Sequence, residues 1–285
     1  MKQSRLPATA VAAFALAAVA LYAVLTLVTP TEPSAARRGP TPRGLPPHAA
    51  AIVADAASGT VYYGDGERRA LPIASVTKLM TALVTLEREP LDALFTAPPY
   101  PSDGDESRMW LATGEQVTVG DLLRGLLLPS GNDAAAALAV GVAGSREAFV
   151  ALMNARAREL GMHDTRYADP IGLDDGNRSS AADLVTLTRA LRRHAFFRAT
   201  VATPHLTTVS GAWARRLDNT NDLLGGPLHV NGVKTGHTKA AGYVLVGSAT
   251  KRGRTVISVV LGTRSERDRD DATLRLLRYG LKRDR

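Results

Sequence analysis

The sequence predicts a mixed α/β fold of the α+β type, in which both ends of the chain contribute strands to one sheet. Three observations lead to this expectation: a β-hairpin pattern over residues 50–63, a second hairpin pattern over residues 243–262, and an almost wholly helical pattern over residues 118–194. When a helical region separates strands of one sheet in this way, the economical arrangement is a helical subdomain inserted into the sheet domain.

The composition describes a globular chain with a basic surface. The chain has 285 residues, a formal net charge of +8, 5% aromatic residues and no cysteine. Excess positive charge favours contact with anionic surfaces such as lipid head groups or a cell-wall polymer. Basic residues are not interleaved with aromatic ones, so we expect no nucleic-acid partner. A cysteine nucleophile is excluded, and the histidines lack paired-ligand spacing, so we expect neither a metal nor a cofactor.

The first 47 residues differ in composition from the rest of the chain. We expect residues 1–7 to be a cytoplasmic N-terminus and residues 8–29 to be a transmembrane anchor or uncleaved signal, because the 21 residues from Ala8 to Val28 are almost wholly apolar and span about 30 Å as a helix. Six prolines make residues 30–47 a semi-extended linker. Residues 48–285 form the folded domain. Signal cleavage near Ser34, which would release a secreted protein, is the alternative.

A hairpin opens the folded part, with strands over residues 50–55 and 60–63 around the turn Ala57-Ser58-Gly59. A helix follows, because apolar residues recur at helical spacing over residues 76–84. Ser75 and Lys78 stand three residues apart at its start, so their side chains share one face. A serine hydroxyl becomes a nucleophile when a base lies within hydrogen-bond reach, and a desolvated lysine can be that base. A capping serine beside a surface lysine is the alternative.

The helical middle contains the second candidate element. Apolar spacing predicts a helix over residues 119–127 that Thr118 caps and Pro129 ends, and another helix that begins at Asp133. Ser130 and Asn132 then lie on a tight connection, where both side chains can point into a cleft. Because such residues are common in turns, a plain turn is the alternative.

The third candidate element is the strand over residues 230–238. It presents a cation at Lys234, a hydroxyl at Thr235 and bare backbone at Gly236 to a ligand. An edge strand with an exposed lysine is the alternative. If this strand approaches the first element, we expect Lys78 and Lys234 to lower each other's pKa. The second hairpin follows over residues 243–250 and 255–262, and a last helix is expected over residues 271–281.

The ordered set of Ser75-x-x-Lys78, Ser130-x-Asn132 and Lys234-Thr235-Gly236 resembles the D-alanyl-D-alanine carboxypeptidases, the low-molecular-mass penicillin-binding proteins. Further segments look like the same family, namely residues 128–135, 153–154, 160–162, 169–173 and 219–221. The resemblance covers about residues 48–281. It implies a β-lactamase/transpeptidase-like fold, with an antiparallel sheet flanked by helices and an inserted all-helical subdomain.

The resemblance also implies a reaction, in which a serine-type carboxypeptidase removes the terminal D-alanine from peptidoglycan stem pentapeptides through an acyl-enzyme. β-Lactam antibiotics are then covalent inhibitors. By matching motifs, Ser75 attacks the penultimate D-alanine carbonyl, Lys78 takes its proton, and Ser130 relays a proton to the leaving nitrogen. The matched substrate-binding residues are Asn132 for the substrate amide, Lys234 and Thr235 for the terminal carboxylate, Gly236, and the His237 backbone, which shares the oxyanion hole with that of Ser75.

Three other functions remain open for such a chain. A class A β-lactamase needs a glutamate that activates water, and between Asn132 and Lys234 only Glu147 and Glu159 are available, both in a helical pattern. A D-alanyl-D-alanine endopeptidase is harder to separate, because the same site cuts cross-links. The non-enzymatic alternative is a catalytically idle wall-binding protein. Because peptidoglycan lies outside the cytoplasmic membrane, we expect a single-pass membrane protein with an extracytoplasmic catalytic domain.

Overall fold

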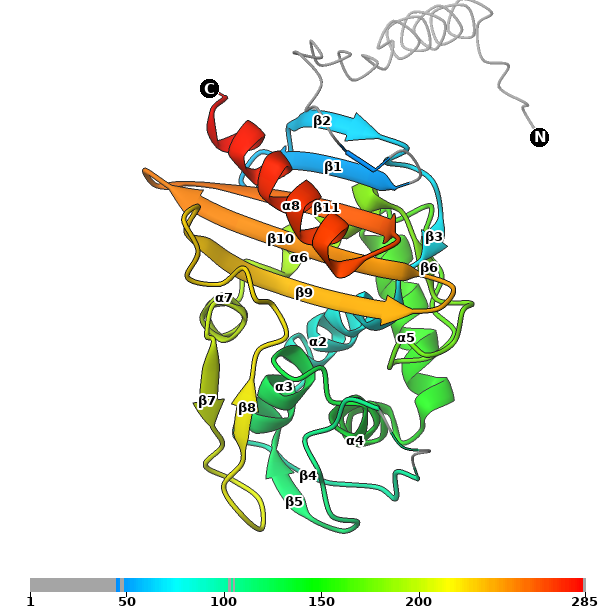
Figure 1. Cartoon of the computed structure of the whole chain (residues 1–285). Coiled ribbons are helices and arrows are strands. Elements are labelled where there is room, and N and C mark those ends of the chain that lie inside the picture. Colours follow the sequence, from blue (N-terminus) through cyan, green and yellow to red (C-terminus); the bar gives the residue numbers. More distant parts are fainter. Residues whose placement is uncertain (1–44, 47–48, 102–103, 105, 284–285) are drawn as a thin grey trace, which may run out of the picture. The chain divides into compact units, whose positions relative to one another are not determined.

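A five-stranded antiparallel sheet dominates the computed structural model, which describes residues 45–46, 49–101, 104 and 106–283 (Figure 1). The strand order is β2-β1-β11-β10-β9, so strands from both ends of the chain meet where β1 pairs with β11. The predicted single sheet is therefore confirmed. Its strands are β1 (Ala50–Asp55), β2 (Val61–Asp65), β9 (Val230–Thr238), β10 (Gly242–Lys251) and β11 (Arg254–Thr263).

Both hairpins lie where the sequence predicts them. In the second, Lys251 pairs with Arg254, which leaves a two-residue loop of Arg252 and Gly253. The two loop residues have φ angles of 50° and 75°. Positive φ at both positions is the type I′ geometry, whose twist matches that of the flanking strands.

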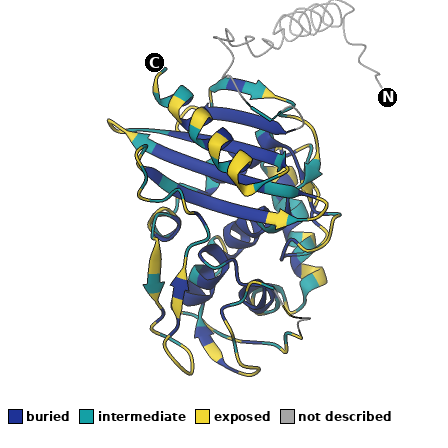
Figure 2. Ribbon diagram, in the orientation of Figure 1, coloured by how far each residue is buried: buried dark blue, intermediate teal, exposed yellow. Residues whose placement is uncertain are grey.

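The sheet is covered on both faces, so its central strands are almost fully buried (Figure 2). Side chains alternate along β1: Ile52 packs into the core shared with the helices, whereas Val53 packs into a second cluster on the opposite face. Helix α8 (Glu266–Leu281) closes that second face with Leu276 and Leu277. The other face packs against the helical part of the chain, as Figure 1 shows.

The helical part is inserted between β2 and β9, and η1 (Ala74–Thr77) with α2 (Lys78–Leu86) forms its centre. Residues Lys78 to Thr85 of α2 are all buried, so the helix is enclosed by its neighbours. The other helices are α3 (Val119–Leu127), α4 (Asn132–Ala143), α5 (Arg146–Glu159), α6 (Ala181–Leu191) and α7 (Ala195–Val201). Three two-stranded sheets join them: β3 (Leu71–Pro72) with β6 (Arg178–Ser179), β4 (Leu94–Thr96) with β5 (Gln116–Thr118), and β7 (His205–Thr207) with β8 (Arg216–Asp218).

Three predicted boundaries are wrong. Helix α8 begins five residues before position 271, because Ser265 caps it and its first turn is charged and lacks the apolar spacing used for the prediction. Asn132 is the first residue of α4 and does not belong to the connection before it. Residues 160–180 contain no helix, because a turn built on Asp169 interrupts the helical middle.

The predicted anchor, linker and cytoplasmic N-terminus lie outside the described residues. Within the part of the chain that the structure describes, no single helix is long and apolar enough to cross a membrane. Helices α4 and α5 meet that length and composition only when they are taken together, and they are bent by 84° at their junction.

Candidate active site

The side chain of Lys78 is the centre of the site. Ser75 lies in η1, and the 3₁₀ turn that continues into α2 places its hydroxyl on the face of Lys78. The lysine Nζ lies 2.9 Å from Ser75 Oγ, and it donates to Asn132 Oδ1 and to the Ile171 carbonyl, each at 2.8 Å. The predicted contact between the first two motifs is therefore present.

These three partners determine which way the proton moves. The Asn132 Oδ1 and the Ile171 carbonyl are acceptors only, whereas the Ser75 hydroxyl can donate or accept. A neutral Lys78 amine therefore keeps its two N–H groups on the two carbonyl oxygens and turns its lone pair toward Ser75. This is the arrangement in which the amine can remove the serine proton.

The surroundings also favour the neutral amine. Lys78 is 0% exposed. This burial lowers its pKa to about 7, although the negative charges of Asp169, Glu106 and Asp133 raise it in part. Of the two causes that we expect from the sequence, desolvation and the charge of Lys234, desolvation is the main one for Lys78.

Lys234 lies in the middle of β9 and is 1% exposed. Burial lowers its pKa well below the ordinary value, and the charges of Lys78 and Arg269 lower it further. The expected influence of one lysine on the other therefore appears at Lys234. Its Nζ donates to the Thr235 carbonyl at 2.9 Å. The lysine is buried, so the alternative of an exposed lysine on an edge strand is wrong.

The rest of the third motif faces the first. A Cβ on Gly236 would lie 3.0 Å from the Ser75 backbone nitrogen and 2.9 Å from Val244 Cγ2, so the absence of a side chain favours the close approach of β9 to Ser75. The Thr235 hydroxyl lies 2.6 Å from that of Thr220. His237 is exposed, and its ring stacks on Tyr243 with the ring centroids 4.1 Å apart.

Ser130 lies on the connection between α3 and α4 with a φ of 64°, a conformation that is rare for a residue other than glycine. The following amide, of Gly131, donates to the Gly125 carbonyl at 2.8 Å and fixes this turn. Ser130 Oγ is buried and has no hydrogen-bond partner among the described residues. A buried hydroxyl without a partner is available to a bound molecule.

Glu106 was missed by the sequence analysis. Its Oε2 accepts a hydrogen bond from Asn132 Nδ2 at 3.0 Å and another from the Tyr100 hydroxyl at 2.6 Å. Although burial raises the pKa of Glu106, these two bonds and the charges of Arg108 and Lys78 outweigh it, and the pKa lies below its ordinary value. The carboxylate orients the Asn132 amide, so that its oxygen faces Lys78.

Asp169 was also missed as a contributor to the site. Both of its carboxylate oxygens accept backbone N–H groups, from Ile171 and Gly172 on one oxygen and from Leu173 and Asp174 on the other. The turn they form delivers the Ile171 carbonyl to Lys78. No motif at Ser75, Ser130 or Lys234 points to this turn, and only the family-like segment at residues 169–173 signals it.

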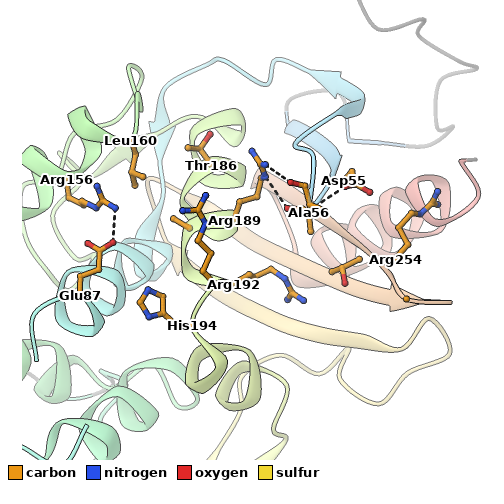
Figure 3. Close-up of a pocket in the computed structure, with 15 residues that line it drawn as sticks. Asp55, Ala56, Glu87, Arg156, Leu160, Thr186, Arg189, Arg192, His194 and Arg254 are labelled. Carbon is orange, nitrogen blue, oxygen red and sulfur yellow. Dashed lines mark hydrogen bonds and ion pairs between the residues drawn. The ribbon is translucent and has the colours of Figure 1, made fainter. Parts of the chain in front are cut away.

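A cavity of about 490 Å³ lies away from these residues, at the opposite end of α2 (Figure 3). It borders Glu87, which directly follows the last residue of α2, so about 13 Å of helix separates it from Lys78. Two of its arginines already have partners: Arg156 pairs with Glu87 at 2.8 Å, and Arg189 donates to the carbonyls of Ala56 and Ala57. This cavity contains none of the motif residues.

Comparisons with known proteins agree with the geometry. Residues 46–265 match the family described as Peptidase_S11, D-alanyl-D-alanine carboxypeptidase. The chain is 35% identical to D-alanyl-D-alanine carboxypeptidase DacD of Salmonella typhimurium over 80% of this chain and 61% of the relative. It is 37% identical to DacC of Escherichia coli over 81% of this chain and 60% of the relative. The matched region therefore spans about three-fifths of these relatives.

Solved structures show the same fold. Penicillin-binding protein 6B from Escherichia coli superposes with a TM-score of 0.79 at 34% identity, over 87% of this chain and 81% of that one. The Streptomyces K15 DD-transpeptidase superposes with a TM-score of 0.77 at 34% identity, over 84% of this chain and 99% of that one. The β-lactamase/transpeptidase-like fold expected from the sequence is confirmed, and the chain belongs to the D-alanyl-D-alanine carboxypeptidase family, peptidase family S11.

Proposed function

We propose that this chain is a serine-type D-alanyl-D-alanine carboxypeptidase that removes the terminal D-alanine from peptidoglycan stem pentapeptides and is acylated by β-lactams. The observation that carries the proposal is the buried Lys78 amine, which has a pKa of about 7 and lies 2.9 Å from Ser75 Oγ. A base that is half neutral near physiological pH suits the activation of a serine nucleophile.

In the first half of the reaction, Ser75 Oγ attacks the penultimate D-alanine carbonyl while Lys78 takes the hydroxyl proton. The developing oxyanion accepts hydrogen bonds from the Ser75 and His237 backbone N–H groups, and the close packing of Gly236 on the Ser75 nitrogen supports this assignment. Ser130, whose hydroxyl has no hydrogen-bond partner among the described residues, relays a proton to the leaving nitrogen. Water then hydrolyses the acyl-enzyme and regenerates Ser75.

Substrate recognition uses the remaining motif residues. Asn132 donates an N–H to the substrate amide, and the hydrogen bond to Glu106 orients its amide group. Lys234 and Thr235 bind the terminal carboxylate, which supplies the counter-charge for a buried amine.

Two other enzyme activities are alternatives. A D-alanyl-D-alanine endopeptidase of Pseudomonas aeruginosa is 36% identical over 86% of this chain, so cross-linked peptides are the second substrate to test. A class A β-lactamase is disfavoured, because Glu147 and Glu159 lie at the two ends of α5, outside the hydrogen-bond network of Lys78. A catalytically idle wall-binding protein is disfavoured by the intact contact between Ser75 and Lys78.

The chain also suits a single-pass membrane protein with its catalytic domain outside the cytoplasm. The apolar residues 8–29 and the net charge of +8 support this placement beside an anionic membrane and wall. Secretion after signal cleavage is the alternative, in which the domain is extracytoplasmic without an anchor.

For the reaction, we expect the wild-type chain to release D-alanine from a muropeptide pentapeptide and to be labelled by fluorescent penicillin. Ser75→Ala should lower both by at least about 10⁴-fold, because Ser75 carries the hydroxyl that contacts the Lys78 amine. Mass spectrometry of the muropeptides and gel fluorescence measure the two effects. Labelling that persists in Ser75→Ala would refute the nucleophile assignment.

For the pH dependence, we expect acylation by penicillin to rise as the pH increases through about 7, because Lys78 accepts a proton only when it is neutral. Glu106→Gln removes a negative charge that raises the Lys78 pKa. The rise of the acylation rate with pH should therefore move to lower pH in this variant, which shifts the acidic limb of the pH–rate profile. Glu159→Gln is the matched control, since Glu159 pairs with Arg156 on the surface. An acidic limb that stays in place in Glu106→Gln would contradict the coupling.

For substrate recognition, Lys234→Ala should lower kcat/KM for peptides with a free terminal carboxylate by about 10²-fold, because a charge-assisted hydrogen bond is lost. The kcat/KM for a substrate amidated at that carboxylate should fall much less in this variant. Steady-state release of D-alanine or D-alaninamide measures both. An equal fall of kcat/KM for the two substrates would show that Lys234 does not bind the terminal carboxylate.

For localisation, we expect protease added to intact spheroplasts to digest the catalytic domain, and membrane fractionation to recover the untreated chain with the membrane. Full protection from the protease would contradict an extracytoplasmic domain. Recovery in the medium would favour signal cleavage over an anchor.

A further inference from the structure

The cavity at the far end of α2, which we call the arginine cavity, is lined mainly by cations. It lies where the end of β1 and the start of β11 meet α5 and α6, and Figure 3 shows Arg189, Arg192 and Arg254 around it. Its volume of about 490 Å³ is typical of a small-molecule site. The charged residues that line it are Asp55, Glu87, Arg156, Arg189, Arg192, Arg193 and Arg254. Five arginines therefore share the cavity with two carboxylates.

Both carboxylates are engaged by other groups. Glu87 pairs with Arg156 at 2.8 Å, and Arg156 also pairs with Glu159 at 3.0 Å. Asp55 accepts two backbone N–H groups from the turn of the first hairpin, each at 2.9 Å. Among the described residues, neither carboxylate forms an ion pair with the other four arginines of the cavity. The positive charge of these four arginines is therefore not neutralised locally.

The four arginines have only neutral partners. Arg189 donates to two backbone carbonyls at the end of the first hairpin strand, and Arg254 donates to two backbone carbonyls at the C-terminal end of α8. Arg192 donates to the Ser248 hydroxyl at 3.3 Å. The side chain of Arg193 forms neither a hydrogen bond nor an ion pair within the part of the chain that the structure describes. Arg192 and Arg193 thus keep most of their N–H groups for a ligand.

Arg192 is half-buried, and its surroundings disfavour an isolated positive charge. Desolvation and the charge of Arg198 lower the pKa of Arg192 below its ordinary value. A cation withdrawn from water is stabilised by a nearby anion, and a concave site lined by charge of one sign concentrates ions of the opposite sign. The arginine cavity therefore favours an anionic ligand.

The number and type of these cations favour a phosphate group over a single carboxylate. A guanidinium presents its N–H donors in a planar fork that matches two oxygens of a phosphate. A phosphate monoester carries about two negative charges near neutral pH, whereas a carboxylate carries one. Several adjacent guanidinium groups are therefore better neutralised by phosphate.

We propose that the arginine cavity binds a phosphate group, either of a soluble phosphate or diphosphate compound or of a phospholipid head group. About 13 Å of helix α2 separates the cavity from Lys78, so its ligand does not compete with a substrate at Ser75. The inference does not depend on the proposed function, because it uses no residue of the three motifs.

Calorimetric titration of the full chain in a non-ionic detergent tests the proposal at constant ionic strength. Inorganic pyrophosphate and dihexanoyl phosphatidylglycerol are the two probes, and citrate is a polycarboxylate control. Saturable binding of at least one phosphate probe is expected. Tighter binding of pyrophosphate would indicate a soluble ligand, and tighter binding of the lipid would indicate a head group. Binding of neither probe, or equally tight binding of citrate, would overturn the proposal.

Arg192→Gln combined with Arg193→Gln should weaken binding of the tighter probe at least about tenfold, because charge-assisted hydrogen bonds are lost. Arg88→Gln combined with Arg158→Gln is the matched control. It removes the same charge from two exposed arginines that do not line the cavity, so the Kd should stay within about twofold. Equal weakening in the two double variants would show only general attraction to a basic surface and would overturn the assigned site.

Glu87→Gln provides a readout of opposite sign. It removes a carboxylate from the cavity and releases Arg156 from one of its two ion pairs, so the tighter probe should bind about threefold more tightly. Glu87 is exposed, so this variant tests the site even if the substitution of Arg192 disturbs folding. Unchanged or weaker binding in Glu87→Gln would contradict the proposal.

Discussion

The structure of the site depends on one buried amine and its three hydrogen bonds. Lys78 connects η1, the start of α4 and the Asp169 turn, because its partners are Ser75, Asn132 and the Ile171 carbonyl. An amine removed from water is unstable without such partners. Burial of the amine lowers its pKa, and its need for hydrogen-bond partners holds the three segments together around Ser75. Packing of α2 in the core and reactivity of Ser75 therefore have the same physical origin.

The sheet supplies the second half of the site by bringing β9 against the first turn of the nucleophile helix. This approach is possible because Gly236 has no side chain where the Ser75 nitrogen lies. The pairing of β1 with β11 joins the two chain ends into one rigid platform, on which β9 is the edge strand beside η1. A scaffold that holds its donors in place before the substrate arrives stabilises developing charge without reorganisation.

Local patterns predicted the elements that carry the motifs, because Ser75, Ser130 and Lys234 each lie next to a clear apolar period or turn signal. Two kinds of feature could not be read in this way. The partnership of Glu106 with Asn132 joins residues 26 positions apart through side-chain geometry. The Asp169 turn acts through a backbone carbonyl, which no residue type marks. Both desolvation and a neighbouring cation were expected to lower the Lys78 pKa, but the two could not be ranked from the sequence, because the extent of burial depends on the whole fold.

The burial of Lys234 has a consequence for ligand selectivity. Among the described residues, the hydrogen-bond acceptor of its amine is the neutral Thr235 carbonyl, and burial lowers the Lys234 pKa and so disfavours the ammonium form. A carboxylate placed beside the amine would favour the ammonium form and raise the pKa of Lys234 again. Neutral analogues of the same shape gain no such charge pair. The buried Lys234 amine therefore favours ligands that carry a negative charge. The affinity for such ligands should depend on pH independently of the pH dependence of the chemical step.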